Sequence, residues 1–172
     1  MLRGLKPGAL LLLLGACAGD APLLPSYSPG QTESDRLNAW LEQQYEEELR
    51  FSPMELTFLG RKELGDQLDD FSLDARARLL AWQRGSVRQM QRRFDYDRLD
   101  ASAKLSFDLW KFRHEAAAAM QPWWGHEYVF EQMNGPQSQL PTFLINFHAV
   151  DNEDDLQAYL ARIAQVPRAM RQ

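Results

Sequence analysis

The stretch from residue 120 to 144 constrains the fold of this chain more than any other part. Long patterns with helical spacing lie on both sides of it. Five prolines and glycines interrupt it, and a proline lacks a backbone donor and clashes with the preceding helical turn. We therefore expect no helix to run straight through it. The interrupting residues are Pro122, Gly125, Gly135, Pro136 and Pro141.

The same stretch carries a large amount of apolar surface. An irregular segment of this kind has to cover its large side chains, and aromatic residues bury the most area. The sequence therefore predicts that the segment packs against the helices on either side of it. The side chains concerned are Trp123, Trp124, Tyr128, Val129, Phe130, Met133, Leu140 and Phe143.

Two helices are predicted near the start of the folded part. Helical spacing extends over residues 35–50, with glutamates mostly on the opposite face. Ser52 then suits a helix cap, and Pro53 suits a first helical position. Glu55 is placed to reach back to the cap, and Gly60 suits a left-handed end. The first apolar stripe is Leu37, Trp40, Leu41, Tyr45 and Leu49.

Two long helices should follow a polar, acidic loop at residues 61–71. The first is capped by Ser72 and ends near residue 94; the second begins at Asp100 or Ser102 and ends near residue 121. Gly85 in the middle of the first predicts a close helix crossing. The predicted core stripes are Leu79, Leu80, Val87, Met90 and Phe94 in the first, with Trp82 on a second face, and Leu105, Leu109, Phe112, Ala116 and Met120 in the second.

A short buried helix at residues 140–147 and a final helix complete the pattern. The acidic run 151–154 favours a helix N-terminus, and Pro167 should kink the helix near its end. The final apolar stripe, which continues to Gln172 without a cap, predicts an N-terminal section of a longer protein. That stripe is Leu156, Tyr159, Leu160, Ile163 and Val166.

These patterns together predict an all-α fold, a multi-helix bundle or array. The 172 residues suit one domain, and nine Phe, five Trp and five Tyr are enough for a core. The formal net charge of −5 argues against nucleic acid as a partner, because nucleic-acid-binding domains usually present a basic face.

The helix at residues 72–94 is rich in arginine. We expect these side chains to pair with the chain's many carboxylates at the surface. The alternative is contact with anionic lipid or phosphate. The arginines are Arg76, Arg78, Arg84, Arg88, Arg92 and Arg93.

The first 16 residues read as a secretory leader. Arg3 and Lys6 precede a short leucine-rich segment, and Leu14-Gly15-Ala16-Cys17 follows. This ending resembles the bacterial lipobox, which implies cleavage before Cys17 and acylation of its thiol and new amino group. Several acyl chains together anchor a protein stably. The alternative is an ordinary signal peptide with an incidental cysteine.

The anchor would place the protein in the bacterial cell envelope. Ala18 after Cys17 favours the outer membrane, facing the periplasm. Residues 17–34 have a Pro-, Gly- and Ser-rich linker composition and could span roughly 55 Å when extended. The predicted divisions are therefore a leader at 1–16, a linker at 17–34 and a helical domain at 35–172.

No complete active site is visible in the residues alone. His114-Glu115 and His126-Glu127 each begin like a zinc-protease helix, but the second histidine is missing in both. The acidic loop lacks the spacing of a calcium site. No Gly-x-Ser-x-Gly elbow is present, and Cys17 is committed to the anchor. We therefore predict no catalytic, cofactor-binding or metal-binding residue in this chain.

The order of several short motifs nevertheless resembles a bacterial family, domain of unknown function 885. The resemblance covers residues 35–172. It depends on Ser52-Pro53 with Leu59-Gly60, Phe71-Ser72, Leu99, Met133-Asn134-Gly135-Pro136-Gln137, Leu140-Pro141, Asp151-Asn152-Glu153-Asp154-Asp155, Tyr159-Leu160-Ala161-Arg162-Ile163 and Val166-Pro167.

The resemblance implies a function that the residues alone do not. Members of the family are several times longer, largely helical and similar to zinc metallopeptidases, with a His-Glu pair and Pro-Gly-His later in the chain. Neither His114 nor His126 is followed by Pro-Gly-His. The resemblance thus implies zinc and a peptide substrate for the full-length parent, with this segment walling a substrate channel. The rival hypothesis is a non-enzymatic envelope lipoprotein that acts as a scaffold or binding module.

Overall fold

The predicted all-α fold is confirmed. The computed structural model describes residues 30–126, 128 and 130–172, and every regular element in them is a helix. The predicted leader and Cys17 lie outside the described residues. None of the described helices is both long and apolar enough to span a bilayer. The helices are α1 (Glu33–Leu49), α2 (Pro53–Phe58), α3 (Leu73–Arg93), η1 (Tyr96–Arg98), α4 (Ala101–Met120), η2 (Gln121–His126), α5 (Pro136–Asn146) and α6 (Glu153–Ala169).

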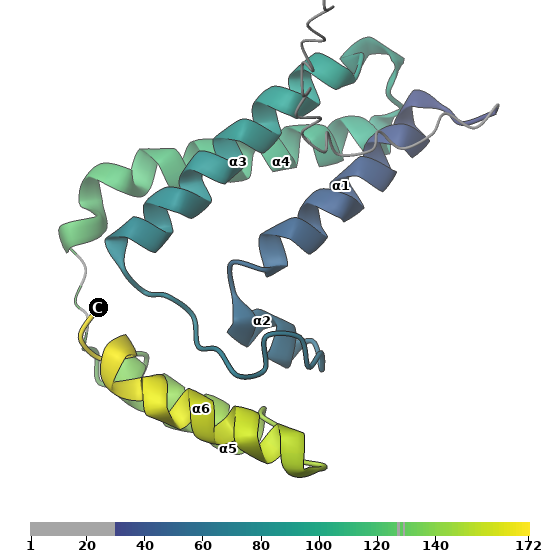
Figure 1. Cartoon of the computed structure of the whole chain (residues 1–172). Coiled ribbons are helices and arrows are strands. Elements are labelled where there is room, and N and C mark those ends of the chain that lie inside the picture. The colour runs from purple at the N-terminus through teal and green to yellow at the C-terminus, as the bar shows by residue number, and fades with distance from the viewer. Residues whose placement is uncertain (1–29, 127, 129) are drawn as a thin grey trace, which may run out of the picture.

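Three long helices, α1, α3 and α4, form the upper bundle in Figure 1. Trp40 is its central side chain, with ring centroids 5.6 Å from Phe94 and 6.4 Å from Trp110. Trp110 also donates a 2.7 Å hydrogen bond to the hydroxyl of Ser86. The buried core of this bundle is Leu37, Trp40, Met90, Phe94, Leu99, Ala103 and Phe107.

A second core holds α2, the loop after it, α5 and α6 together. In Figure 1, α5 and α6 lie side by side below the upper bundle, and α2 lies above them on the side toward that bundle. The buried members come from all four segments, so this lower layer is a packing unit of its own. They are Met54, Leu68, Leu140, Phe143, Leu144 and Ala169.

The helix starts follow the predicted caps. The hydroxyls of Ser52 and Ser72 accept hydrogen bonds from the amides of the third residue of α2 and α3. Gly60 has φ +75°, the left-handed conformation predicted for it. The prediction missed the capping box formed by Thr32 and Asp35, which starts α1 two residues earlier than expected.

The predicted core stripe of α4 is wrong. Leu105, Leu109 and Phe112 are 54–69% exposed. The inner face carries Phe107 and Trp110 instead, because these rings fit the aromatic core and Trp110 finds a hydrogen-bond partner. Two apolar stripes run along this helix, and spacing alone does not distinguish them.

The predicted stripe of α6 is wrong for three of its five members. Leu156, Leu160 and Ile163 are 43–50% exposed, whereas Arg162 is fully buried. Tyr159 and Val166 pack against the second core as predicted. The physical reason is that backbone carbonyls of the loop after α2 accept hydrogen bonds from Arg162 and so stabilise this arginine in the interior.

The central stretch departs from its prediction in two ways. Leu140 and Phe143 are buried, but Trp123, Tyr128 and Met133 are 58%, 87% and 80% exposed. Helix α5 begins earlier than predicted, at Pro136, which suits a first helical position. It also contains Pro141 in its interior, where the ring removes one backbone donor. The exposed side chains find no covering helix among the described residues.

The close crossing predicted at Gly85 is also wrong. A Cβ built on this glycine would meet nothing within 4 Å.

Pro167 lies inside α6, which continues to Ala169 and is capped at Met170.

Candidate functional site

Arg162 on α6 is the buried hub of the lower layer. Its guanidinium is planar and carries five donors, so it can bind several segments at once. Here it joins α2, the loop after α2 and the segment that follows α5. Its acceptors are Nδ1 of His148 at 2.7 Å, the hydroxyl of Thr57 at 2.8 Å and the carbonyls of Gln67, Pro53 and Leu64 at 2.9, 3.3 and 3.4 Å.

The contact between Arg162 and His148 fixes the state of the imidazole. An arginine only donates, so Nδ1 of His148 has to accept. Nε2 therefore carries the proton and donates to the carbonyl of Asp155 at 3.2 Å. Burial and the charge of Arg162 lower the pKa of His148. A neutral histidine in this place positions Arg162.

Asp69 ties the loop to the start of α2. Its carboxylate accepts from the hydroxyl of Ser52 at 2.7 Å and from the amide of Met54 at 2.9 Å. Burial raises the pKa of Asp69, against the opposing effect of these two hydrogen bonds and of the charge of Arg162. The amide of Ser52, which Glu55 was predicted to reach, donates instead to the carbonyl of Leu49 at 3.0 Å.

A salt-bridged cluster lies beside this hub. The ammonium of Lys62 is 2.7 Å from the carboxylate of Asp155 and 2.9 Å from that of Asp151. The hydrogen bonds that Lys62 donates to these two carboxylates raise its pKa, and the bond to Asp155 lowers the pKa of that carboxyl. The cluster fixes the acidic start of α6 to the loop after α2.

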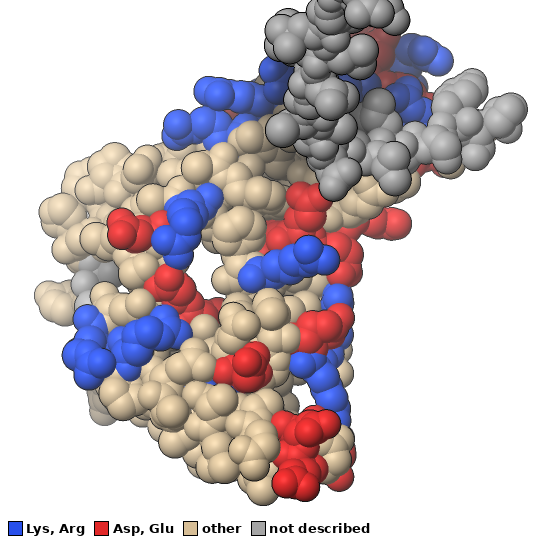
Figure 2. All heavy atoms as spheres, in the orientation of Figure 1, with Lys and Arg blue, Asp and Glu red and all other residues tan. Residues whose placement is uncertain are grey.

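A groove of about 590 Å³ lies between the two layers. This volume is in the range of ligand sites, about 300–1,000 Å³. Figure 2 shows the molecule hollowed between the upper bundle and the lower layer. The apolar part of its lining is Leu49, Phe51, Pro53, Leu68, Phe71, Ala75 and Leu79, together with the ring of Tyr45.

Charges of both signs line the same groove. Arg113 contacts the carboxylate of Glu48 at 3.2 Å, and Arg78 contacts that of Asp70 at 2.9 Å. Asp69 reaches the lining from the loop. Paired charges above an apolar wall can exchange partners with a bound zwitterion, so the groove suits a ligand that carries both charges.

The two histidines that begin zinc-like motifs, His114 and His126, do not have the surroundings of metal ligands among the described residues. His114 is half-buried on α4, and its Nδ1 is enclosed without a hydrogen-bond partner in the described residues. Burial and the nearby Arg84 lower its pKa. The ring of His126 packs against Trp123 at 5.7 Å. Among the described residues, no three His, Cys, Asp or Glu side chains come together as metal ligands.

Comparison with known proteins identifies the family. The family described as bacterial proteins of unknown function (DUF885) matches residues 53–172. The chain belongs to this family. No curated protein and no solved structure matches. Much of the DUF885 match coincides with the lower layer, including all the segments that contact Arg162.

Sequence reasoning missed the hub itself. Arg162 stands three residues after Tyr159 and four before Val166, within the inward side of an amphipathic pattern. A charged residue at such a position is the available signal, because long charged side chains are rarely buried without partners. Its acceptors could not be found in the same way, since three of them are backbone carbonyls, two in the loop after α2 and one at the start of α2.

Proposed function

We propose that this chain forms a helical wall of a larger zinc-dependent peptidase of the bacterial cell envelope, and that the metal site lies outside it. The observation that carries the proposal is the groove between the two layers. Its apolar wall and its charges of both signs suit a short peptide, which has apolar side chains and two charged ends. Zinc needs three protein ligands that converge, and the described residues offer no such set.

Exposed apolar surface supports a larger fold. The outward stripes of α4 and α6 have helical spacing and expose large side chains. A soluble protein rarely leaves such patches uncovered, and they mark interaction surfaces. Under this proposal, further helices of the peptidase cover them.

The anchor is a separate part of the proposal. Acylation of Cys17 would hold the enzyme at the membrane, with its substrate groove in the periplasm. Mass spectrometry of the mature protein should find a lipidated Cys17 at the N-terminus. A mature protein that still begins at Met1 would contradict the lipid anchor but would not bear on the proposed peptidase activity.

The groove is tested in the product of the full reading frame. Hydrolysis of short peptides by this full-length protein should require zinc and should stop when a chelator is added. Ala75→Trp places a ring in the groove and should raise KM while kcat is retained. Ala77→Trp, on the exposed face of the same helix, is the matched control and should leave KM unchanged. Chelator-resistant hydrolysis, or equal KM for both variants, contradicts the proposal.

The second candidate is a non-enzymatic envelope lipoprotein that acts as a scaffold or binding module. The exposed stripe of α4 favours it, because helix-in-groove partners recognise side chains at such spacing. A stop codon directly after Gln172, with no peptidase activity in a well-folded sample, would favour the scaffold.

A further inference from the structure

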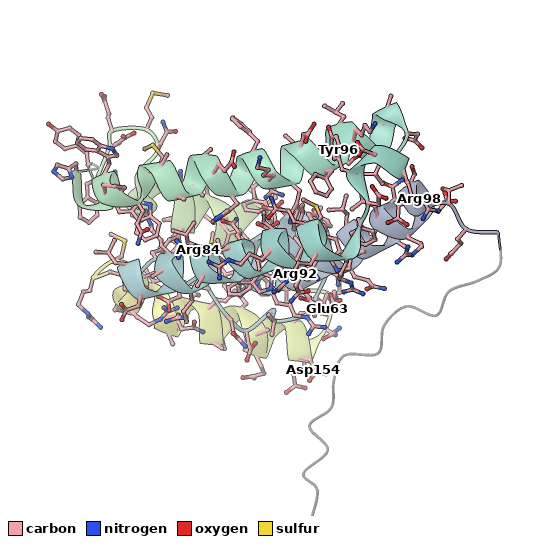
Figure 3. All side chains as sticks on the ribbon, turned by 90° about the horizontal axis from the view of Figure 1, so that it is seen from above. Glu63, Arg84, Arg92, Tyr96, Arg98 and Asp154 are labelled. Carbon is pink, nitrogen blue, oxygen red and sulfur yellow. The ribbon has the colours of Figure 1, made fainter. Side chains whose placement is uncertain are left out.

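The outward face of α3 carries a row of arginines. Arg84, Arg88 and Arg92 follow one another at four-residue steps, so they lie on one side of the helix, and all three are exposed. Figure 2 shows basic side chains gathered along the upper edge of the bundle. Figure 3, seen from above, places Arg84 and Arg92 along α3.

These arginines do not follow the expected pairing with carboxylates. Within the described residues, no ion pair involves Arg84, Arg88 or Arg92, whereas Arg78 at the other end of α3 is paired with Asp70. Between residues 75 and 94 the helix contains no acidic residue at all. The row is therefore a strip of uncompensated positive charge on a protein whose net charge is −5.

The residues around the arginine row have short side chains. Ala77 and Ala81 are exposed on the same side of the helix, and Gly85 has open space where a side chain would be. The guanidiniums are thus the projecting groups of this face. A flat array of phosphates could meet all of them at once, which a single small anion could not.

The row ends beside the entry of the chain into the fold. The amide of Asp95 donates to Glu33 at 2.9 Å, and the amide of Asp100 donates to Ser34 at 2.9 Å. The turn after α3 therefore contacts the first residues of α1, and Figure 3 shows Arg98 at that end. The tether predicted between Cys17 and α1 would leave the domain here.

Exposed acidic residues follow the row in the turn after α3, at Asp95, Asp97 and Asp100, and a further acidic group lies in the lower layer. The start of α6 carries Glu153, Asp154 and Asp155, in the lower layer, where Figure 2 shows red side chains at the bottom of the view. An anionic surface would attract one edge of the molecule and repel the other. It would therefore bind this protein in one orientation, with the α3 face toward it.

We propose that the arginine row of α3 docks on the anionic phospholipid headgroups of the membrane. Arginine binds phosphate through its planar fork, and each basic residue near an anionic bilayer contributes about a fivefold gain in binding. The contact is independent of the proposed peptidase and does not require acylation of Cys17. It orients the domain, with the lower layer away from the lipid.

The test uses the full-length, non-acylated chain with two kinds of vesicle. One is pure phosphatidylcholine and the other contains about 30% phosphatidylglycerol. Arg88→Gln/Arg92→Gln removes two charges from the row. The matched control, Arg50→Gln/Arg171→Gln, removes two charges from exposed arginines elsewhere and gives the same net charge. Circular dichroism checks that both variants are folded.

We expect the wild type to prefer the anionic vesicles and to be released by roughly 0.5 M salt, which screens the charges. The row variant should bind about 30-fold more weakly, and the control should lose less than about threefold. Equal losses in both variants would refute the docking face, because net charge alone would then explain binding. So would equal binding to both vesicles, or a preference for DNA over anionic vesicles.

Discussion

Replacing Arg162 by methionine should loosen the lower layer of the molecule. The substitution keeps a long apolar stem but removes every donor of the guanidinium. Five acceptors lose their bond to Arg162, and three of these bonds are 2.9 Å or shorter, although the carbonyl of Pro53 keeps the hydroxyl of Thr57 at 3.3 Å. The carbonyl of Gln67 and Nδ1 of His148 then lack this donor in a site where Arg162 is fully buried.

The size of the effect follows from two opposing contributions. A hydrogen bond to a charged group stabilises by about 1.5–3 kcal/mol, and a buried acceptor left alone costs about 1–3 kcal/mol. Removal of the charge also ends the cost of burying it, which offsets part of this loss. The net destabilisation should be ~3–5 kcal/mol, because several buried acceptors lose a charged donor at once. A domain with about 5–15 kcal/mol of stability would then be close to unfolding.

Urea unfolding followed by circular dichroism measures the loss. Hydrogen exchange should show faster opening of α5 and α6 than of α1, α3 and α4, because only the lower layer depends on Arg162. Arg168→Met is the matched control on the same helix, since its bonds to the loop carbonyls are 3.4 Å long. The control should lose no more than about 1 kcal/mol. An Arg162→Met protein as stable as that control would refute the reasoning.

Two further results are expected. Burial and the charge of Arg162 hold the pKa of His148 below its ordinary value in the folded protein, so the unfolded chain binds a proton more readily. The free energy of unfolding should therefore fall as the pH drops below about 6.5, and it should level off below the pKa of His148 in the folded protein. His148→Gln can keep both hydrogen bonds and should flatten this profile, leaving only the slope due to His114; an unchanged profile would contradict the assignment. Gly85→Ala should stabilise α3 by roughly 0.5–1 kcal/mol in urea unfolding, because the site is open, and a loss would show a close contact there.

Helix positions could be predicted because local chemistry sets them. Ser52 and Ser72 accept from nearby amides, Gly60 takes a left-handed conformation, and Asn152 caps the acidic start of α6. Each of these features involves residues within four positions of one another. Spacing along the chain therefore contains all the information that these ends require.

The groove and the hub could not be predicted in this way. Asp69 caps α2 from 15 residues further along the chain, and Arg162 binds carbonyls about 100 residues before it. Every residue has a backbone carbonyl, so no sequence pattern shows which carbonyls will accept from Arg162. Only Arg162 itself could be suspected, from its place beside buried apolar residues.

The error on α4 has a different origin and bears on the proposed function. This helix has one apolar face that contains Phe107 and Trp110 and another that contains Leu105, Leu109 and Phe112. A helix apolar on two sides is typical of the interior of a larger fold, where neighbours cover both. The predicted stripe faces outward in this chain and would be core in the proposed peptidase. Its replacement by charged residues should therefore leave the fold of this chain intact and impair only assembly with the remainder.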